Sequence, residues 1–456
     1  MQMILREVEA CAALEQHLAI DVLSRRLSLA LIDQVLTQPQ RHERRRRKLP
    51  ASVTLLLCIA LALLAQESIP AVYRQLVAGL RWIWPHPLSV TPGALCQARY
   101  RLGAQPLVAL FHAIAQPLTT PATPEAFYHG LRLVAVDGSK LDVPDTPANV
   151  RAFGRTGVVR GQAPWPQVLV VALCECASHA ILDAGVWPVR GDEPAAALRL
   201  LRRLPPQSLL LYDAGLHSRD LIQRARQREA HILGRLSSRV QPQLVAPLSD
   251  GTALVQLRSR GHEPVLPPLR LIHDTLDDPP RPGHRRDARL LTSLLDPSQY
   301  PAKELILLYH QRWEFELGLD ELVVHQRPHT PLRSQKPVGI IQELYALFLA
   351  HVLLRSLMVE AAATVDLPPT RLSFLETLRL VRLALPDLQR FAPSHHPLII
   401  QTLLDDIAAT VLPTRRDRLN PRVIKRAQSK FPKKRPHHRP SPKPTKTFRD
   451  AIVLLN

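Results

Sequence analysis

Three acidic residues lie in sequence contexts that suit them for chemistry. Asp137 ends the apolar run VAVD, Asp213 ends the run LLLYD, and Glu316 lies within YHQRWEFELGLDELV. Short continuous apolar runs of this kind predict buried strands. Carboxylates at the carboxyl ends of adjacent strands meet at one edge of a sheet, and a later helix can bring a third carboxylate there. The pattern therefore predicts a cluster of three acids.

Three carboxylates together suit Mg²⁺ or Mn²⁺, which prefer oxygen ligands. Two such ions about 4 Å apart could activate a water or hydroxyl and stabilise the leaving oxygen of a phosphodiester. Each acid alone has a simpler explanation, because an Asp after a strand is often a turn residue. Glu316 could also be the i,i+4 partner of Arg312 on a solvated face. The combination of all three acids in a basic chain favours the metal site.

The segment around Glu316 has a polar helical face. At about 100° per residue, Tyr309, Arg312, Glu316 and Val323 fall within an arc of roughly 60°. An Arg and a Tyr beside a carboxylate could bind phosphate or orient the acid. The adjacent apolar flank would attach the helix to the sheet and consists of Leu308, Phe315, Leu319 and Leu322.

The charge balance points to a polyanionic partner. The chain has 59 Lys and Arg against 39 Asp and Glu, a formal net charge of +20. We expect nucleic acid ahead of a membrane surface, although a merely basic protein is the alternative. Arg99 and Arg101 project from a helix predicted over residues 89–103, where a solvated basic face is equally compatible. The strongest basic run contains Arg44, Arg45, Arg46, Arg47 and Lys48.

The apolar spacing divides the chain into regions. The first ~120 residues favour helices, and strand-like runs begin near residue 131 and are interrupted by a helical stretch at 194–203. Further strand-like runs fill residues 233–298, and helices follow from 338 to about 385. Together these elements indicate a mixed α/β core. The tail from 415 to 449 is rich in basic residues and proline and cannot form a core.

Cellular location follows from the cysteines and from one apolar segment. Five cysteines, an odd number, do not suggest a disulfide framework, so we expect a reducing cytoplasm. The run VTLLLCIALALLA at 53–65 is too short to span a membrane and too far from the start for a signal peptide. We interpret it as a buried helix and expect no membrane association.

The motifs together resemble a known family. The spacing Tyr-x-x-Arg-x-x-x-Glu, with Trp313 directly after the Arg, resembles the signature of DDE transposases of the insertion-sequence type-four family. VAVDGSKLDVPDTPANVRAFG is similar to the family's first-aspartate block and LLLYDAGLHSRDLI to its second. A stretch near the start of the chain and the segment at 332–358 after the glutamate are similar as well, so the likeness spans nearly the whole chain. The chain departs from the family at Val323, where the pattern has Lys.

The resemblance implies a ribonuclease-H-like catalytic core with a β-rich insertion, an all-helical N-terminal domain before it, and helices and a basic tail after it. The corresponding domains are 1–125 for DNA binding, 126–413 for catalysis with the insertion at about 233–298, and 414–456 for the tail. It implies that Asp137, Asp213 and Glu316 bind Mg²⁺ or Mn²⁺ and that Tyr309 and Arg312 contact DNA phosphates.

The implied function is transposition of a bacterial insertion element. Such an enzyme binds the element's terminal inverted repeats and cuts and transfers DNA strands, with double-stranded element ends and target DNA as partners. We expect a homodimer in the synaptic complex and a cytoplasmic, nucleoid-associated protein. Two alternatives remain. Val323 favours a catalytically impaired relative that binds DNA or inhibits transposition, and a nuclease of RNA·DNA hybrids is disfavoured by the N-terminal helices and the long insertion.

Overall fold

A computed structural model describes residues 27–37, 49–77, 90–158, 161–258, 265–274, 288–327 and 331–413. These residues belong to one compact unit, which ends at Pro413. The basic run at 44–48 and the basic tail lie outside the described residues.

The described N-terminal residues form helices, as predicted. They are α2 (Leu29–Thr37), α3 (Ala51–Leu63), α4 (Ile69–Leu76), α5 (Pro92–Leu102) and α6 (Gln105–Ile114). Almost every residue of α3 is buried, which confirms that its apolar run is a core helix. At the start of α5, Thr91 accepts a hydrogen bond from the Ala94 N–H, and Gly103 ends the helix with a φ of 68°.

The centre of the molecule is one mixed sheet with the strand order β6-β5-β2-β7-β8-β12-β11-β10-β9. Its first strands are β2 (Leu131–Asp142), β5 (Gln167–Glu175), β6 (Ile181–Pro188), β7 (Ser208–Tyr212) and β8 (His231–Arg235). β2, β7 and β8 run parallel, while β5 is antiparallel to both β2 and β6. The short strand β1 (Phe127–Tyr128) pairs with β2 and belongs to the same sheet. β3 (Gly157–Val158) and β4 (Gly161–Gln162) form a separate two-stranded sheet, and α7 (Pro147–Phe153) precedes them.

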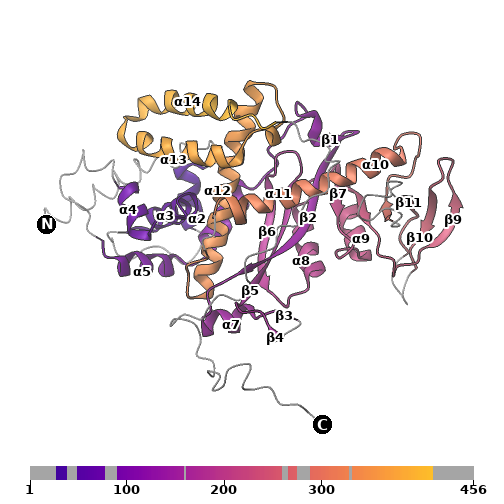
Figure 1. Cartoon of the computed structure of the whole chain (residues 1–456), viewed down its shortest axis with the longest axis horizontal. Coiled ribbons are helices and arrows are strands. Elements are labelled where there is room, and N and C mark those ends of the chain that lie inside the picture. The colour runs from indigo at the N-terminus through magenta and orange to yellow at the C-terminus, as the bar shows by residue number, and fades with distance from the viewer. Residues whose placement is uncertain are drawn as a thin grey trace, which may run out of the picture. The chain divides into compact units, whose positions relative to one another are not determined.

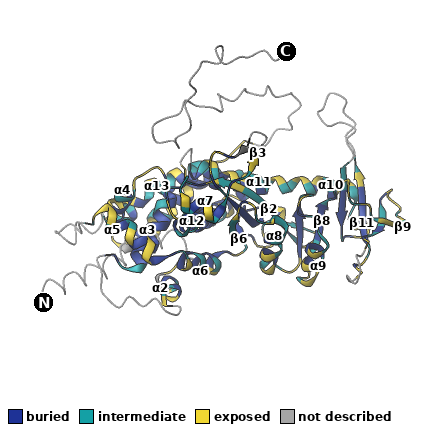
Figure 2. Cartoon of the chain, turned by 90° about the horizontal axis from the view of Figure 1, so that it is seen from below, coloured by how far each residue is buried: buried dark blue, intermediate teal, exposed yellow. Residues whose placement is uncertain are grey.

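Strand β2 is buried on both faces, because its side chains alternate between two hydrophobic cores. Leu133 and Ala135 join the core formed with the N-terminal and C-terminal helices. Val134 and Val136 join the second core, formed with α8 (Glu193–Leu200) and α9 (Arg219–Gln227). The part of the sheet around β2 is therefore covered on both sides (Figures 1 and 2).

The strand-rich region before Glu316 extends the same sheet and does not form a separate one. β9 (Gln243–Pro247), β10 (Ala253–Gln256), β11 (Leu269–Asp274) and β12 (Ala288–Thr292) are all antiparallel, and β12 pairs with β8. These four strands lie within residues 233–298, where the sequence predicts strand-like runs. The chain then returns across the sheet through α10 (Ala302–Tyr309) and α11 (Trp313–Asp320) (Figure 1).

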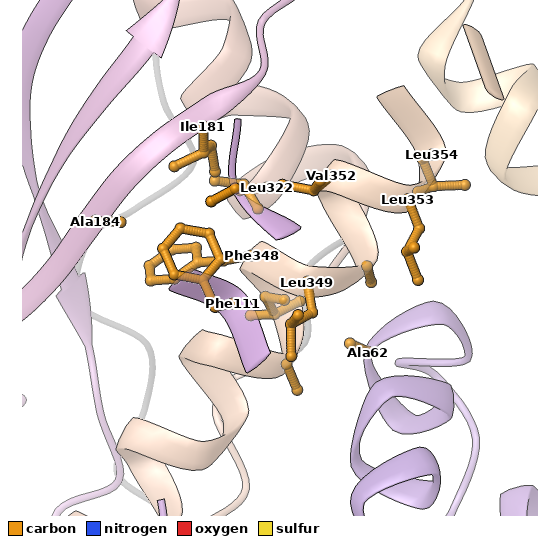
Figure 3. Close-up of a cluster of buried hydrophobic side chains, with 14 of the residues drawn as sticks. Ala62, Phe111, Ile181, Ala184, Leu322, Phe348, Leu349, Val352, Leu353 and Leu354 are labelled. Carbon is orange, nitrogen blue, oxygen red and sulfur yellow. The ribbon is translucent and has the colours of Figure 1, made fainter. Parts of the chain in front are cut away.

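The last described helices are α12 (Pro337–Thr364), α13 (Phe374–Arg390) and α14 (His396–Ala408), which pack together. Among the described residues, α12 alone is long and apolar enough to cross a membrane, but 78% of its most apolar window is buried inside the protein. It is the central helix of the core: Phe348, Leu349 and Val352 pack against residues from α3, α6 and β6 (Figure 3).

Candidate active site

Asp137 and Asp213 are brought together by the parallel pairing of β2 and β7. Val136 is the partner of Tyr212, the last pair in this ladder, so Asp137 and Asp213 each directly follow a paired residue at the same edge. Asp213 follows the last residue of β7, as predicted. Our expectation that Asp137 ends its strand is wrong, because β2 continues to Asp142. Its extension is paired with β5, which reaches beyond the end of β7.

Glu316 lies on α11, which contacts β2 and β5. The sequence predicts one regular helix over this segment, but the structure has two helices and two irregular turns. A 3₁₀ turn (His310–Arg312) separates α10 from α11, and a π-helical turn (Glu321–His325) follows. These changes of pitch break the 100° spacing between Glu316 and Val323. Val323 is partly buried and packs against the hydrophobic core.

Arg312 joins the first and third acids. Its guanidinium donates to Asp137 Oδ2 at 2.8 Å and to Glu316 Oε1 at 3.0 Å. The Arg312 side chain is 11% exposed, and those of Asp137 and Glu316 are 20% and 41% exposed. Arg312 thus places a positive charge between two carboxylates that both remain accessible to solvent.

Tyr309 supports the second acid. Its hydroxyl donates to the backbone carbonyl of Tyr212, the residue before Asp213, at 3.3 Å. Asp213 Oδ1 in turn accepts from the Gly215 N–H at 2.5 Å. Tyr309, Arg312 and Glu316 therefore all lie at the rim formed by β2 and β7, and the apolar flank anchors them there, with Phe315 only 1% exposed.

A fourth acid, Glu193, lies beside the predicted triad. It begins α8, and its carboxylate fills the space next to Gly138, where an added side-chain carbon would collide with it. Sequence reasoning missed this residue because an acid and a proline in the first helical turn are ordinary features of a helix start. The signal that could have found it is the placement of α8 directly before the strand that carries Asp213.

The site is strongly coupled electrostatically. Burial raises the pKa of Asp137 to about 6, and the nearby carboxylates of Asp213 and Glu193 also raise it, against the Gly138 N–H and Arg312. Burial likewise raises the pKa of Glu193, with Asp213 adding to the shift and Lys140 opposing it. The site has an excess of negative charge that a cation would neutralise.

The donor chemistry of these acids fits a hard divalent cation. Asp137 and Glu316 already share one cation, the Arg312 guanidinium, and Asp213 is close enough to affect the pKa of Asp137. The three carboxylates of Asp137, Asp213 and Glu316 are nevertheless too far apart to bind one metal ion together. Within the described residues, no three His, Cys, Asp or Glu side chains are close enough to hold one metal ion. Metal binding at this rim therefore requires the three carboxylates to draw together.

The two arginines predicted to bind DNA from α5 differ in their surroundings. Arg101 is exposed. Arg99 is 7% exposed and donates to Ser334 Oγ at 3.2 Å and to Glu343 Oε1 at 3.3 Å. Its guanidinium therefore faces α12 and the loop before it, and we do not retain Arg99 as a DNA contact. The sequence prediction missed this burial because Ser334 and Glu343 are more than 200 residues away in the sequence, and the pattern of α5 alone does not indicate them.

Comparison with known proteins gives one consistent result. Residues 17–112 match the family described as insertion element 4 transposase N-terminal, and residues 128–353 match the transposase DDE domain. Transposase InsG for insertion sequence element IS4, from Escherichia coli strain K12, is 31% identical over 416 residues, covering 88% of this chain and 91% of that protein.

Two further similarities cover different shares of the chain. Putative transposase InsZ of the same organism is 34% identical over 130 residues, which is 28% of this chain and 44% of that protein. A solved synaptic complex of piggyBac transposase with hairpin DNA has a TM-score of 0.40 and 12% identity, covering 85% of this chain and 84% of that one.

The mixed sheet with its parallel strands β2, β7 and β8 lies in the region that matches the transposase DDE domain, and it is the ribonuclease-H-like core of the class of DDE transposases. The chain belongs to this class and, within it, to the insertion element 4 family of transposases. It is an enzyme of transposition that cuts and transfers DNA strands. The resemblance, fold class and function predicted from the sequence are confirmed.

Proposed function

We propose that Asp137, Asp213 and Glu316 bind Mg²⁺ or Mn²⁺ and carry out cleavage at the ends of the protein's own insertion element. The observation that carries this proposal is the Arg312 guanidinium shared by Asp137 and Glu316, beside the parallel strand β7, which ends directly before Asp213. Glu193 supports it by adding negative charge at the same rim. DDE transposases generally use divalent metal ions, and these acids are the hard oxygen donors that such ions prefer.

The bound metal would supply activation of the attacking oxygen and stabilisation of the leaving oxygen. Water attacks the phosphodiester at the element end, the P–O3′ bond breaks, and a 3′-hydroxyl leaves. That hydroxyl then attacks a phosphodiester of the other strand or of the target and displaces the 3′-oxygen of the attacked strand. Arg312 can exchange a carboxylate for a DNA phosphate, because both groups are anionic and can accept two parallel hydrogen bonds from a guanidinium. Tyr309 keeps the end of β7 in place and lies where a phosphate could approach.

DNA binding extends beyond the catalytic rim. We propose that Arg101 and the basic run at 44–48 contact the terminal repeats and that the tail from 414 adds sequence-independent affinity. Each phosphate contact releases counterions, so the affinity should fall steeply with salt. Two ends must be joined during the reaction, which favours a homodimer in the synaptic complex and a nucleoid-associated protein in the cytoplasm.

Mn²⁺ binding tests the metal proposal without relying on activity. Calorimetric titration of the wild type should give binding that is weakened at least tenfold by each of Asp137→Asn, Asp213→Asn and Glu316→Gln. Asp320→Asn is the matched control, because Asp320 is exposed on the same helix as Glu316. Equal binding by the three site variants and the control would refute the proposed ligands.

Sedimentation with DNA tests the assembly. The wild type mixed with a duplex of the element end should form a particle with two protein chains and two duplexes. A particle that never exceeds one chain per duplex, at any protein concentration that saturates the DNA, would refute the proposed dimer.

A further inference from the structure

A buried ionic network lies directly behind the helix that carries Glu316. Glu321, the first residue of the π-helical turn, is 7% exposed. Its Oε2 lies 3.0 Å from His351 Nε2 and accepts from Arg355 Nε at 2.9 Å, while its Oε1 pairs with Arg355 Nη2. Both partners, His351 and Arg355, are on the central helix α12. The carboxylate is thus held from the core side of α11.

His179 holds the same segment from the sheet side. It lies in the turn between β5 and β6, with a φ of 57°. Its Nδ1 is 2.9 Å from Glu321 Oε1, and its Nε2 is 3.0 Å from Glu314 Oε2. Glu314 precedes Glu316 by two residues and Glu321 follows it by five. One imidazole therefore contacts the chain on both sides of Glu316.

The turn and the helix approach each other closely at Gly318. A side-chain carbon added there would lie 3.3 Å from His179 Cβ, which is tighter than most packed contacts. Next to Glu321, Leu322 packs with Ile181 and Phe348 in the hydrophobic core (Figure 3). The distance between α11 and the β5–β6 turn is therefore fixed by contacts of two kinds, polar and apolar.

The Glu321 carboxylate is paired with all three residues, whereas His351 Nδ1 and Arg355 Nη1 are buried without a hydrogen-bond partner among the described residues. Burial acts to raise the pKa of Glu321, but Arg355 and His179 outweigh it and hold that pKa well below its usual range. A buried carboxylate with one partner removed would be costly, whereas apolar replacement of a buried pair is often tolerated. Stability alone therefore does not require charged residues at these positions. Their directional contacts can instead fix the position of the helical segment that they hold.

We propose that Glu321, held by His179, His351 and Arg355, fixes the axial position and rotation of α11 and so aims Glu316 at Asp137. These four residues act through Glu316 and are positioning residues. The inference rests on the proposed role of Glu316 in metal binding. A π-helical turn directly after α11 offsets the helix by one residue, and Glu321 is the residue at which that offset begins.

His179→Asn is the first test, because Asn accepts the left-handed backbone of the turn but cannot reach both Glu314 and Glu321. We expect a 10- to 100-fold lower cleavage rate at saturating DNA, and several-fold weaker Mn²⁺ binding in calorimetry. Affinity for the element end should stay close to that of the control Asp320→Asn. The melting midpoint should fall, because the buried Glu321 carboxylate loses one partner, so the assays are run at a temperature where both variants are folded. Unchanged Mn²⁺ binding and cleavage in folded His179→Asn would overturn the inference.

The double variant Glu321→Met with Arg355→Met keeps the inference testable if a single change unfolds the protein. Apolar replacement of the pair should preserve folding, yet Mn²⁺ binding and cleavage should fall as in His179→Asn. A folded double variant with wild-type Mn²⁺ binding would show that the network only fills the core. Wild-type Mn²⁺ binding and cleavage in Glu316→Gln would instead overturn the proposed function, and this inference with it.

Discussion

Arg312 donates a hydrogen bond to Asp137 at 2.8 Å although the two residues are 175 positions apart in the sequence. The same guanidinium contacts Glu316, so one side chain relates the sheet acid to the helix acid. This relationship explains why a narrow face of the α10–α11 segment carries a phenol, a guanidinium and a carboxylate. Each of them is used at the rim where β2 and β7 meet.

Asp137→Asn should abolish cleavage and leave binding of the element end nearly unchanged. The amide is a poorer metal ligand, so the cleavage rate should fall at least about 10³-fold. The folded pKa of Asp137 lies above its ordinary value, so the ionised acid destabilises the fold at pH 7. The neutral amide should therefore raise the unfolding free energy by about 1–2 kcal/mol. Weakened folding with residual cleavage would instead give Asp137 a structural role in β2.

Glu193→Gln should weaken metal binding without changing the shape beside Gly138. Removing one negative charge from the rim should raise the half-saturating Mn²⁺ concentration about fivefold, equivalent to roughly 1 kcal/mol. Asp192→Asn is the matched control, since Asp192 is exposed and makes no side-chain cap to α8. A metal titration of cleavage in which both variants behave alike would contradict a role for Glu193.

Arg99→Met should affect folding and not DNA binding. Glu343 would lose a partner in a largely buried pair, which should cost about 3 kcal/mol in denaturant unfolding. The slope of log affinity against log salt should stay unchanged in the folded variant. Arg101→Met, on the same helix, should cost under about 1 kcal/mol and reduce that slope by about one. A reduced slope of log affinity against log salt in Arg99→Met would mean that Arg99 does contact DNA.

His217 should make the protein sensitive to acid. Burial lowers the pKa of this histidine to about 4, and its Nδ1 lies 3.2 Å from the Tyr212 hydroxyl. With a folded pKa below the unfolded value, the unfolded state takes up the proton first, so stability falls as the pH drops below about 6.5. Between pH 7.5 and 5 this should remove about 2 kcal/mol.

The comparison variant for this effect is His217→Gln, which has no proton to gain in that range. Its unfolding free energy, measured by urea denaturation across the same pH values, should lose about 2 kcal/mol less than that of the wild type. Equal losses in the two proteins would mean that His217 does not titrate as its burial indicates.

The sequence predicts those parts of the fold that depend on local patterns. Apolar runs correctly indicate β2, β5, β7 and the four strands before α10, because buried strands need continuous apolar residues. The acids at 137, 213 and 316 could be selected because each lies in a recognisable block. The extension of β2 beyond Asp137 could not be predicted from the sequence, because it depends on pairing with β5.

Long-range partners account for the rest. Arg99 has the spacing of an exposed basic residue, and only the packing of α5 on α12 buries it. Glu193 looks like a helix start until α8 is placed beside Gly138. The π-helical turn at Glu321 has no local sequence signal, because it is held by residues from a distant turn and a later helix.

The most direct test uses duplex DNA that carries the ends of the protein's own element. Wild type and Glu316→Gln are incubated with it in Mg²⁺, in Mn²⁺ and in chelator, and nicks at the element boundary are mapped. We predict a nick that requires both the metal and Glu316. Tight binding of the wild type with no nick under either metal, or an equal nick by Glu316→Gln, would contradict the proposed site.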